Sequence, residues 1–110
     1  MQFLVLGYDG SDEKAFERRM AVREQHLAGS QRMYAAGRWQ DSGALLDDAG
    51  TMIGSFIVCD YPSREELEIQ WLNQEPYVTG KVWERIQIHP IQLSPRACSV
   101  RNGSVETQES

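Results

Sequence analysis

The residues best suited to chemistry in this sequence are two arginines and a histidine that repeat at helical spacing. Arg19, Arg23 and His26 lie four and three residues apart, which places their side chains on one face of a helix. Guanidinium groups bind anionic oxygen, and an imidazole gains and loses a proton near neutral pH. This face therefore either meets a small anionic molecule and moves a proton on it, or simply carries solvated charges.

Further candidates for the same site lie elsewhere in the chain. Glu75 can orient His26 if the fold brings the two residues together. Tyr77 follows two positions later, and a phenol beside a pocket can donate a hydrogen bond to a ligand. Ser55 lies in an apolar run and can donate a second one. The tryptophans can line a cavity, with Trp39 as the first choice and Trp71 and Trp83 as the others.

The composition excludes several classes of function. The 110 residues suit one domain, and the net charge of -5 with no basic block argues against nucleic acid as a partner. The two cysteines form neither a disulfide framework nor a metal pattern, and no His, Cys and carboxylate cluster has metal-ligand spacing. No cofactor-binding loop is found. The first residues form no signal peptide and no membrane span, so a cytoplasmic protein is expected.

Hydrophobic periodicity predicts six elements. The long helix should be amphipathic, with Phe16, Met20, Leu27 and Tyr34 on one stripe and Gly37 at its end. Ser63 and Glu66 form a capping box that opens a second helix, which should end before Pro76. The elements are predicted as strand 2–8, helix 13–36, strands 38–46 and 52–59 joined by a turn at 47–51, a helix from 63, and strand 82–89.

The last strand should alternate, with Val82, Ile86 and Ile88 on one face and Trp83 on the other, and Pro90 should end it. Residues 1–93 are predicted to form the domain. Residues 94–110 are polar and aperiodic, and are predicted to be a flexible extension.

The order β-α-β-β-α-β predicts an α+β fold, namely a ferredoxin-like antiparallel sheet. The first and third strands are apolar on both faces and should be central, while the second and fourth should be edges. Right-handed crossovers place both helices on one face of the sheet. The other face then carries apolar side chains that need a cover. A second copy of the same sheet is the simplest cover, so a homodimer is predicted.

The order and spacing of several segments resemble the YCII-related domain family. These segments are the opening strand, the run 18–27 that contains the arginines and His26, the segments 36–45 and 54–58, and the Glu-Pro-Tyr element that opens 75–90. The resemblance covers roughly residues 1–92. It implies a dimeric α+β barrel of ferredoxin-like protomers, with a pocket between helix and sheet.

The resemblance also implies an activity. Relatives carry out lyase or isomerase chemistry on small, often aromatic or lactone-like compounds without a cofactor, and they have a histidine–acid pair. The resemblance implies that the family's histidine corresponds to His26, its acid to Glu75, and its arginines to Arg19 and Arg23. The leading hypothesis makes His26 the general acid/base, with the two arginines holding an anionic or enolate oxygen. Tyr77 and Ser55 would orient the substrate.

Two other functions stay open from the sequence. A non-catalytic dimer could use the same face to hold a metabolite or to assist a partner enzyme, and its binding should depend little on pH near the imidazole range. A cofactor-free monooxygenase should consume oxygen with an electron-rich aromatic substrate.

Overall fold

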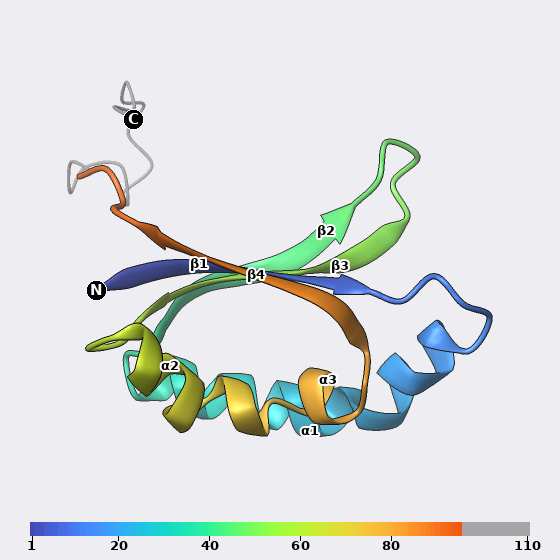
Figure 1. Ribbon diagram of the computed structural model, residues 1–110, viewed down its shortest axis with the longest axis horizontal. Coiled ribbons are helices and arrows are strands. Elements are labelled where there is room, and N and C mark those ends of the chain that lie inside the picture. Colours follow the sequence, from blue (N-terminus) through green and yellow to red (C-terminus); the bar gives the residue numbers. More distant parts are fainter. Residues whose placement is uncertain (96–110) are drawn as a thin grey trace.

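The structure is a computed structural model that describes residues 1–95. It is an α+β fold in which one antiparallel sheet is covered on a single face by helices (Figure 1). The strand order is β2-β3-β1-β4, so the first and third strands are central, as predicted. The elements are β1 (Gln2–Asp9), α1 (Ala15–Ala35), β2 (Trp39–Leu46), β3 (Met52–Asp60), α2 (Arg64–Gln70), the 3-10 helix η1 (Leu72–Gln74), α3 (Pro76–Thr79) and β4 (Trp83–Ile91).

The ends of α1 follow from local sequence. Gly37 has φ +75°, and its N–H donates to the carbonyl of Tyr34 at 3.1 Å while the N–H of Arg38 donates to that of Met33 at 2.9 Å. This left-handed glycine satisfies two carbonyls of the last turn, which confirms the predicted helix end. At the other end, the carboxylate of Asp12 accepts from the N–H of Lys14 and binds the guanidinium of Arg18.

The predicted apolar stripe of α1 does not face the core. Phe16 is 65% exposed and Met20 is 50% exposed, and Leu27 and Tyr34 are also exposed. The helix instead turns Arg19 toward the sheet as a buried side chain. Periodicity identified an amphipathic helix correctly but named the wrong face, because the residues that pack inward include charged groups with partners on the sheet.

The second crossover is three short helices rather than one. Ser63 caps α2 by accepting the N–H of Glu66 at 3.1 Å, as predicted. The helical path breaks at Trp71, which has φ -136° and ψ -63°. The second helix ends before Pro76, as predicted, but Pro76 is then the first residue of a further helix, α3. Proline suits that position, since its fixed φ is helical and its missing N–H would have no partner there.

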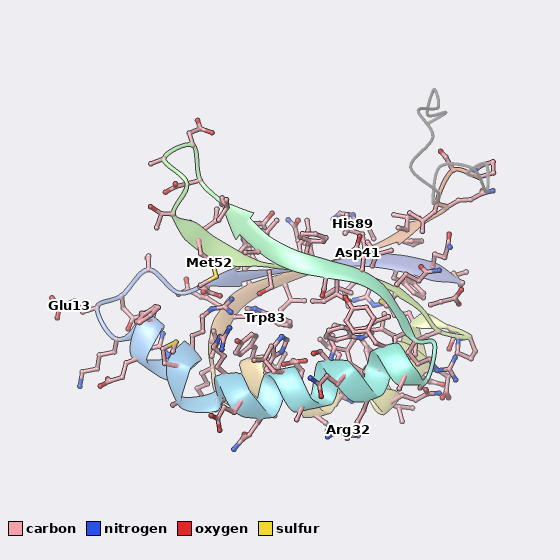
Figure 2. The ribbon with its side chains drawn as sticks, turned by 180° about the vertical axis from the view of Figure 1, so that it is seen from behind. Glu13, Arg32, Asp41, Met52, Trp83 and His89 are labelled. Carbon is pink, nitrogen blue, oxygen red and sulfur yellow. The ribbon has the colours of Figure 1, made fainter. Side chains whose placement is uncertain are left out.

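The last strand departs from the predicted alternation. The pairing of β1 with β4 shifts between Tyr8 and Asp9, so Tyr8 pairs with Arg85 and Asp9 pairs with Trp83. This bulge turns the Trp83 ring to the helical side of the sheet, where it lies directly on Gly7 (Figure 2). A side chain at Gly7 would overlap that ring. Strand β4 also continues through Pro90, which an edge strand tolerates.

The core lies between the helices and the helical face of the sheet. Its fully buried members include Phe3, Val5, Ile57 and Cys59 from β1 and β3. The opposite face has no helix over it (Figure 1). Leu4, Leu6, Phe56 and Val58 are half-buried there. The predicted extension lies, from residue 96 onward, outside the described residues. Within residues 1–95, no helix is long and apolar enough to cross a membrane.

Candidate functional site

A cavity of about 450 Å³ opens between α1 and the strands β2 and β3. Its polar wall contains Arg19, Arg23, His26, Ser55 and Tyr77, so five of the predicted site residues meet around one space. The rest of the lining is mostly apolar and comes from Phe16, Met20, Leu27, Ser42, Gly43, Ala44, Met52, Phe56 and Ile57.

A short polar contact joins His26 of the wall to Glu75. His26 Nδ1 lies 2.6 Å from Glu75 Oε1, although 49 residues separate them in the sequence. Glu75 is 3% exposed, so its carboxylate lies behind the imidazole and away from solvent. With Nδ1 engaged in this contact, Nε2 is the ring nitrogen left for a ligand.

The Glu75 carboxylate is held by two further donors. The indole N–H of Trp71 donates to Oε2 at 2.7 Å, and the backbone N–H of Tyr77 donates to Oε1 at 3.1 Å. The second bond caps α3. The residue before Pro76 is forced out of the helical region, and Glu75 accordingly has φ -62° and ψ 124°, which suits a helix cap. Both oxygens of the Glu75 carboxylate therefore accept hydrogen bonds from fixed donors.

The Tyr77 ring packs against both His26 and Arg19. It stacks on the imidazole with centroids 3.9 Å apart and planes at 15°, and the guanidinium carbon of Arg19 lies 4.4 Å from its centroid. Burial raises the pKa of the Tyr77 phenol, although the charge of Arg19 opposes the shift. The phenol therefore stays protonated at neutral pH and can donate a hydrogen bond.

Arg19 is buried and paired with β1. Its guanidinium binds Asp9 through contacts of 2.9 and 3.2 Å and donates to Ser55 Oγ at 2.9 Å. Burial disfavours its charge, but the hydrogen bond and charge of Asp9 outweigh this and raise the pKa of Arg19. The guanidinium is thus a fixed part of the wall whose charge is largely balanced.

Arg23 is the more available cation. It is exposed at the cavity, one turn after Arg19. No ion pair joins it to any carboxylate among residues 1–95. Its positive charge also acts on the Tyr77 phenol, which places the two groups near each other. An anionic ligand in the cavity would therefore meet Arg23 before any other unpaired charge of the wall.

Trp39 is not where the sequence suggested. It is buried in the core and is absent from the cavity lining. Its ring lies 6.1 Å from that of His26 and packs edge-on against Trp71 at 5.1 Å. Trp39 therefore packs behind the site rather than lining it, because the strand β2 begins there beneath the end of α1.

Two partners of the site were not predicted. Asp9 lies at the end of β1 and pairs with Arg19, and Trp71 binds Glu75. Asp9 stands in a turn-like sequence, where an acid is usually solvated, and only the ten-residue separation from Arg19 could have suggested the pair. Trp71 was considered only as a cavity-lining candidate, although it precedes Glu75 by four residues and that spacing could have suggested the contact. No group of three or more His, Cys, Asp or Glu among residues 1–95 could hold a metal ion.

Known proteins match this chain over most of its length. Protein YciI of Escherichia coli O6:H1 is 28% identical over 84% of this chain and 97% of its own length. An uncharacterized protein of Haemophilus influenzae is 29% identical over 69% of this chain and 83% of its own length.

A solved structure shares the fold. It is the 5-chloro-2-hydroxyhydroquinone dehydrochlorinase TftG from Burkholderia phenoliruptrix AC1100, in complex with 2,5-dihydroxybenzoquinone. The TM-score is 0.70 at 21% identity, over 84% of this chain and 94% of that one. The family described as YCII-related domain matches residues 1–92. The chain therefore belongs to the YCII-related domain family.

Proposed function

We propose that this protein is a small-molecule enzyme of lyase, isomerase or cyclase type that uses His26 as its general acid/base and needs no cofactor. The observation that carries the proposal is the 2.6 Å contact between His26 Nδ1 and buried Glu75, made at the wall of a cavity. A carboxylate that accepts from Nδ1–H leaves the Nε2 lone pair free to take a proton from a bound molecule.

The chemistry requires only proton transfer and charge stabilisation. In an elimination, Nε2 takes a proton from the substrate, the electrons of that bond form a double bond, and an anionic group leaves with its own electron pair. In an isomerisation, protonated His26 returns the proton to a different atom. In both routes, negative charge develops on an enolate-like oxygen of the substrate. Arg23 and the Tyr77 phenol are the groups of the wall that can stabilise this oxygen.

Arg19 and Ser55 have supporting roles in this proposal. The guanidinium of Arg19 holds the ring of Tyr77 and the hydroxyl of Ser55 while Asp9 balances its charge. Ser55 keeps its own O–H free to donate, because it accepts from Arg19. These two residues orient the substrate-facing groups, and Arg23 supplies the net charge.

The lining of the cavity limits the substrate. A space of about 450 Å³ holds a small molecule, and its mostly apolar lining suits a flat ring. We therefore propose a small aromatic, enolic or lactone-like substrate with one anionic oxygen. Two compounds of this kind are associated with TftG, namely the 5-chloro-2-hydroxyhydroquinone of its name and the 2,5-dihydroxybenzoquinone of its complex.

A homodimer is the second part of the proposal. The helix-free face of the sheet has Leu4, Leu6 and Val58 at its centre, with Asp41 at the β2 edge and His89 at the β4 edge (Figure 2). A second copy turned about an axis along the strands would lay each β4 edge over the partner's β2 edge. That arrangement covers the apolar centre and brings unlike edges together.

The enzyme proposal is tested by turnover without added metal or cofactor. The full chain is assayed with 5-chloro-2-hydroxyhydroquinone and with a panel of small enolic and lactone compounds, in the presence and absence of a chelator. We expect at least one compound to be consumed, at a rate that the chelator does not change. Loss of that activity on chelation would contradict the proposal. Consumption of oxygen during turnover would instead indicate the monooxygenase.

A further inference from the structure

We infer that Trp71 is a positioning residue that fixes the proton of His26 on Nδ1 by way of Glu75. The inference rests on the proposed function for its catalytic meaning, but its structural content does not depend on any substrate. It starts from a contact that the general acid/base role does not require, namely the 2.7 Å hydrogen bond from the Trp71 indole to Glu75 Oε2.

The direction of the His26–Glu75 hydrogen bond decides what His26 can do. If Glu75 is ionised, Nδ1 carries the proton and Nε2 presents a lone pair to the cavity. If Glu75 is protonated, it donates to Nδ1, and Nε2 carries a hydrogen that blocks its use as a base. Burial of a carboxylate favours the protonated form, so the site needs donors that oppose it.

Trp71 is the side chain that supplies such a donor. An indole N–H can only donate, so the oxygen it meets must accept. The bond to Oε2 leaves that oxygen without room for a proton in the same direction, and the Tyr77 N–H occupies Oε1 in the same way. Each donor stabilises negative charge on the oxygen it meets, so together they oppose transfer of the shared proton from His26 Nδ1 to Oε1.

The local backbone supports a dedicated role for Trp71. The residue lies at the break between α2 and η1, with φ -136° and ψ -63°. This break lets the indole reach Glu75 across four residues that do not form a regular helix. Trp71 is 4% exposed, and the Trp39 ring packs edge-on against it. The indole is therefore held in place by core packing while its N–H binds the carboxylate.

The chain offers a matched control. Trp83 is also buried, and its ring packs against Tyr77 with centroids 5.7 Å apart. Its indole nitrogen has no hydrogen-bond partner among residues 1–95. Trp83→Phe therefore removes the same atoms from the same core without breaking a bond to Glu75.

The test is the ring ¹⁵N spectrum of the histidines in the full chain, which distinguishes the two tautomers. We expect wild type and Trp83→Phe to show His26 protonated on Nδ1. Trp71→Phe should lose part or all of that population and gain the Nε2–H form, while His89 stays unchanged as an internal reference. An unchanged His26 spectrum in folded Trp71→Phe overturns the inference.

A second variant keeps the test valid if Trp71→Phe does not fold. In Glu75→Gln, an amide oxygen drawn to the Trp71 N–H turns the amide N–H₂ toward His26, so His26 must switch to the Nε2–H form. Without control by Trp71, the oxygen would face the Tyr77 N–H and His26 would keep its Nδ1–H form. The inference predicts the switch in Glu75→Gln and its reversal in the double variant with Trp71→Phe. Retention of the Nδ1–H form in Glu75→Gln overturns it.

Turnover separates this inference from the proposed function. If both hold, Trp71→Phe lowers kcat and leaves KM nearly unchanged, because Trp71 does not line the cavity. If the tautomer switches but turnover does not depend on His26, the positioning role stands and the proposed general acid/base role fails.

Discussion

His26 Nδ1 and Glu75 Oε1 lie 2.6 Å apart because the first turn of α3 meets the middle of α1. The carboxylate cannot leave this position easily, since it also caps α3 and accepts the Trp71 indole. His26, Glu75 and Trp71 thus link the candidate base to a helix cap and to the packed core. Any change to Glu75 is expected to affect both stability and activity.

Arg23 is exposed at the cavity and forms no ion pair among residues 1–95, so its substitution is expected to weaken anion binding selectively. Arg23→Gln should weaken binding of 2,5-dihydroxybenzoquinone by roughly tenfold or more, because a charge-assisted contact is lost. Isothermal titration at low salt measures the effect, and added salt should reduce the difference between the variants. The control is Arg32→Gln, an exposed arginine in the last turn of α1. Equal weakening by both substitutions would show that Arg23 acts only through general charge.

The Arg19–Asp9 pair predicts a stability effect. Arg19→Met leaves the Asp9 carboxylate without its buried partner, so we expect the free energy of unfolding to fall by about 3–5 kcal/mol. The adjacent Arg18 also binds an aspartate but lies near the surface, so Arg18→Met should cost much less. Urea denaturation compares the two. A similar loss in both variants would mean that burial of the Arg19 pair is unimportant.

The uncovered sheet face predicts an oligomeric state. Wild type should be a dimer at micromolar concentration by light scattering. Leu6→Lys should shift it to monomer, since Leu6 lies at the centre of the helix-free face between Phe56 and Gln87. Ile69→Lys places the same charge on an exposed apolar residue of α2 and should stay dimeric. A monomeric wild type, or a dimeric Leu6→Lys, contradicts the proposed interface.

A buried thiol and two buried phenols predict a loss of stability in alkaline solution. Burial raises the pKa of the Cys59 thiol to about 12 and also raises the pKa of the Tyr61 and Tyr77 phenols. The unfolded chain releases these protons from pH 9 to 10 upward, where the folded chain still holds them. The free energy of unfolding should therefore fall as pH rises above about 9.

Denaturant midpoints at pH 8 and pH 10 measure this dependence. Tyr61→Phe removes one of the three groups and should make the dependence shallower. A midpoint that stays constant over this range, or an unchanged slope in Tyr61→Phe, would contradict the assignment of the effect to these buried groups.

The fold was predictable because its signals are short-range. The apolar runs in β1 and β3, the Ser63 cap and the Gly37 helix end each depend on neighbours in sequence, and the structure confirms them. The bulge that turns Trp83 inward was not predictable, since it depends on how β4 pairs with β1. The exposed stripe of α1 was missed for a similar reason, because the partner that buries Arg19 lies on β1.

The site was predictable in its members and not in its contacts. The helical spacing placed Arg19, Arg23 and His26 on one wall, and the structure puts them there. The role of Trp71 was not anticipated, because the partner of a buried indole N–H depends on which acceptor the folded chain places beside it, here the carboxylate of Glu75. The sequence pattern did not distinguish core from cavity lining for Trp39, because an aromatic residue in a strand of mixed polarity suits either place.

Substitution of each of the two histidines of the chain tests the proposed general acid/base most directly. His26→Ala should lower kcat by about 10²–10⁴-fold on whichever compound the wild type consumes, with an unchanged circular dichroism spectrum. His89→Ala removes an exposed histidine from the opposite face of the sheet and should keep the wild-type rate (Figure 2). A folded His26→Ala protein that turns over its substrate at the wild-type rate would contradict the role of His26 as general acid/base.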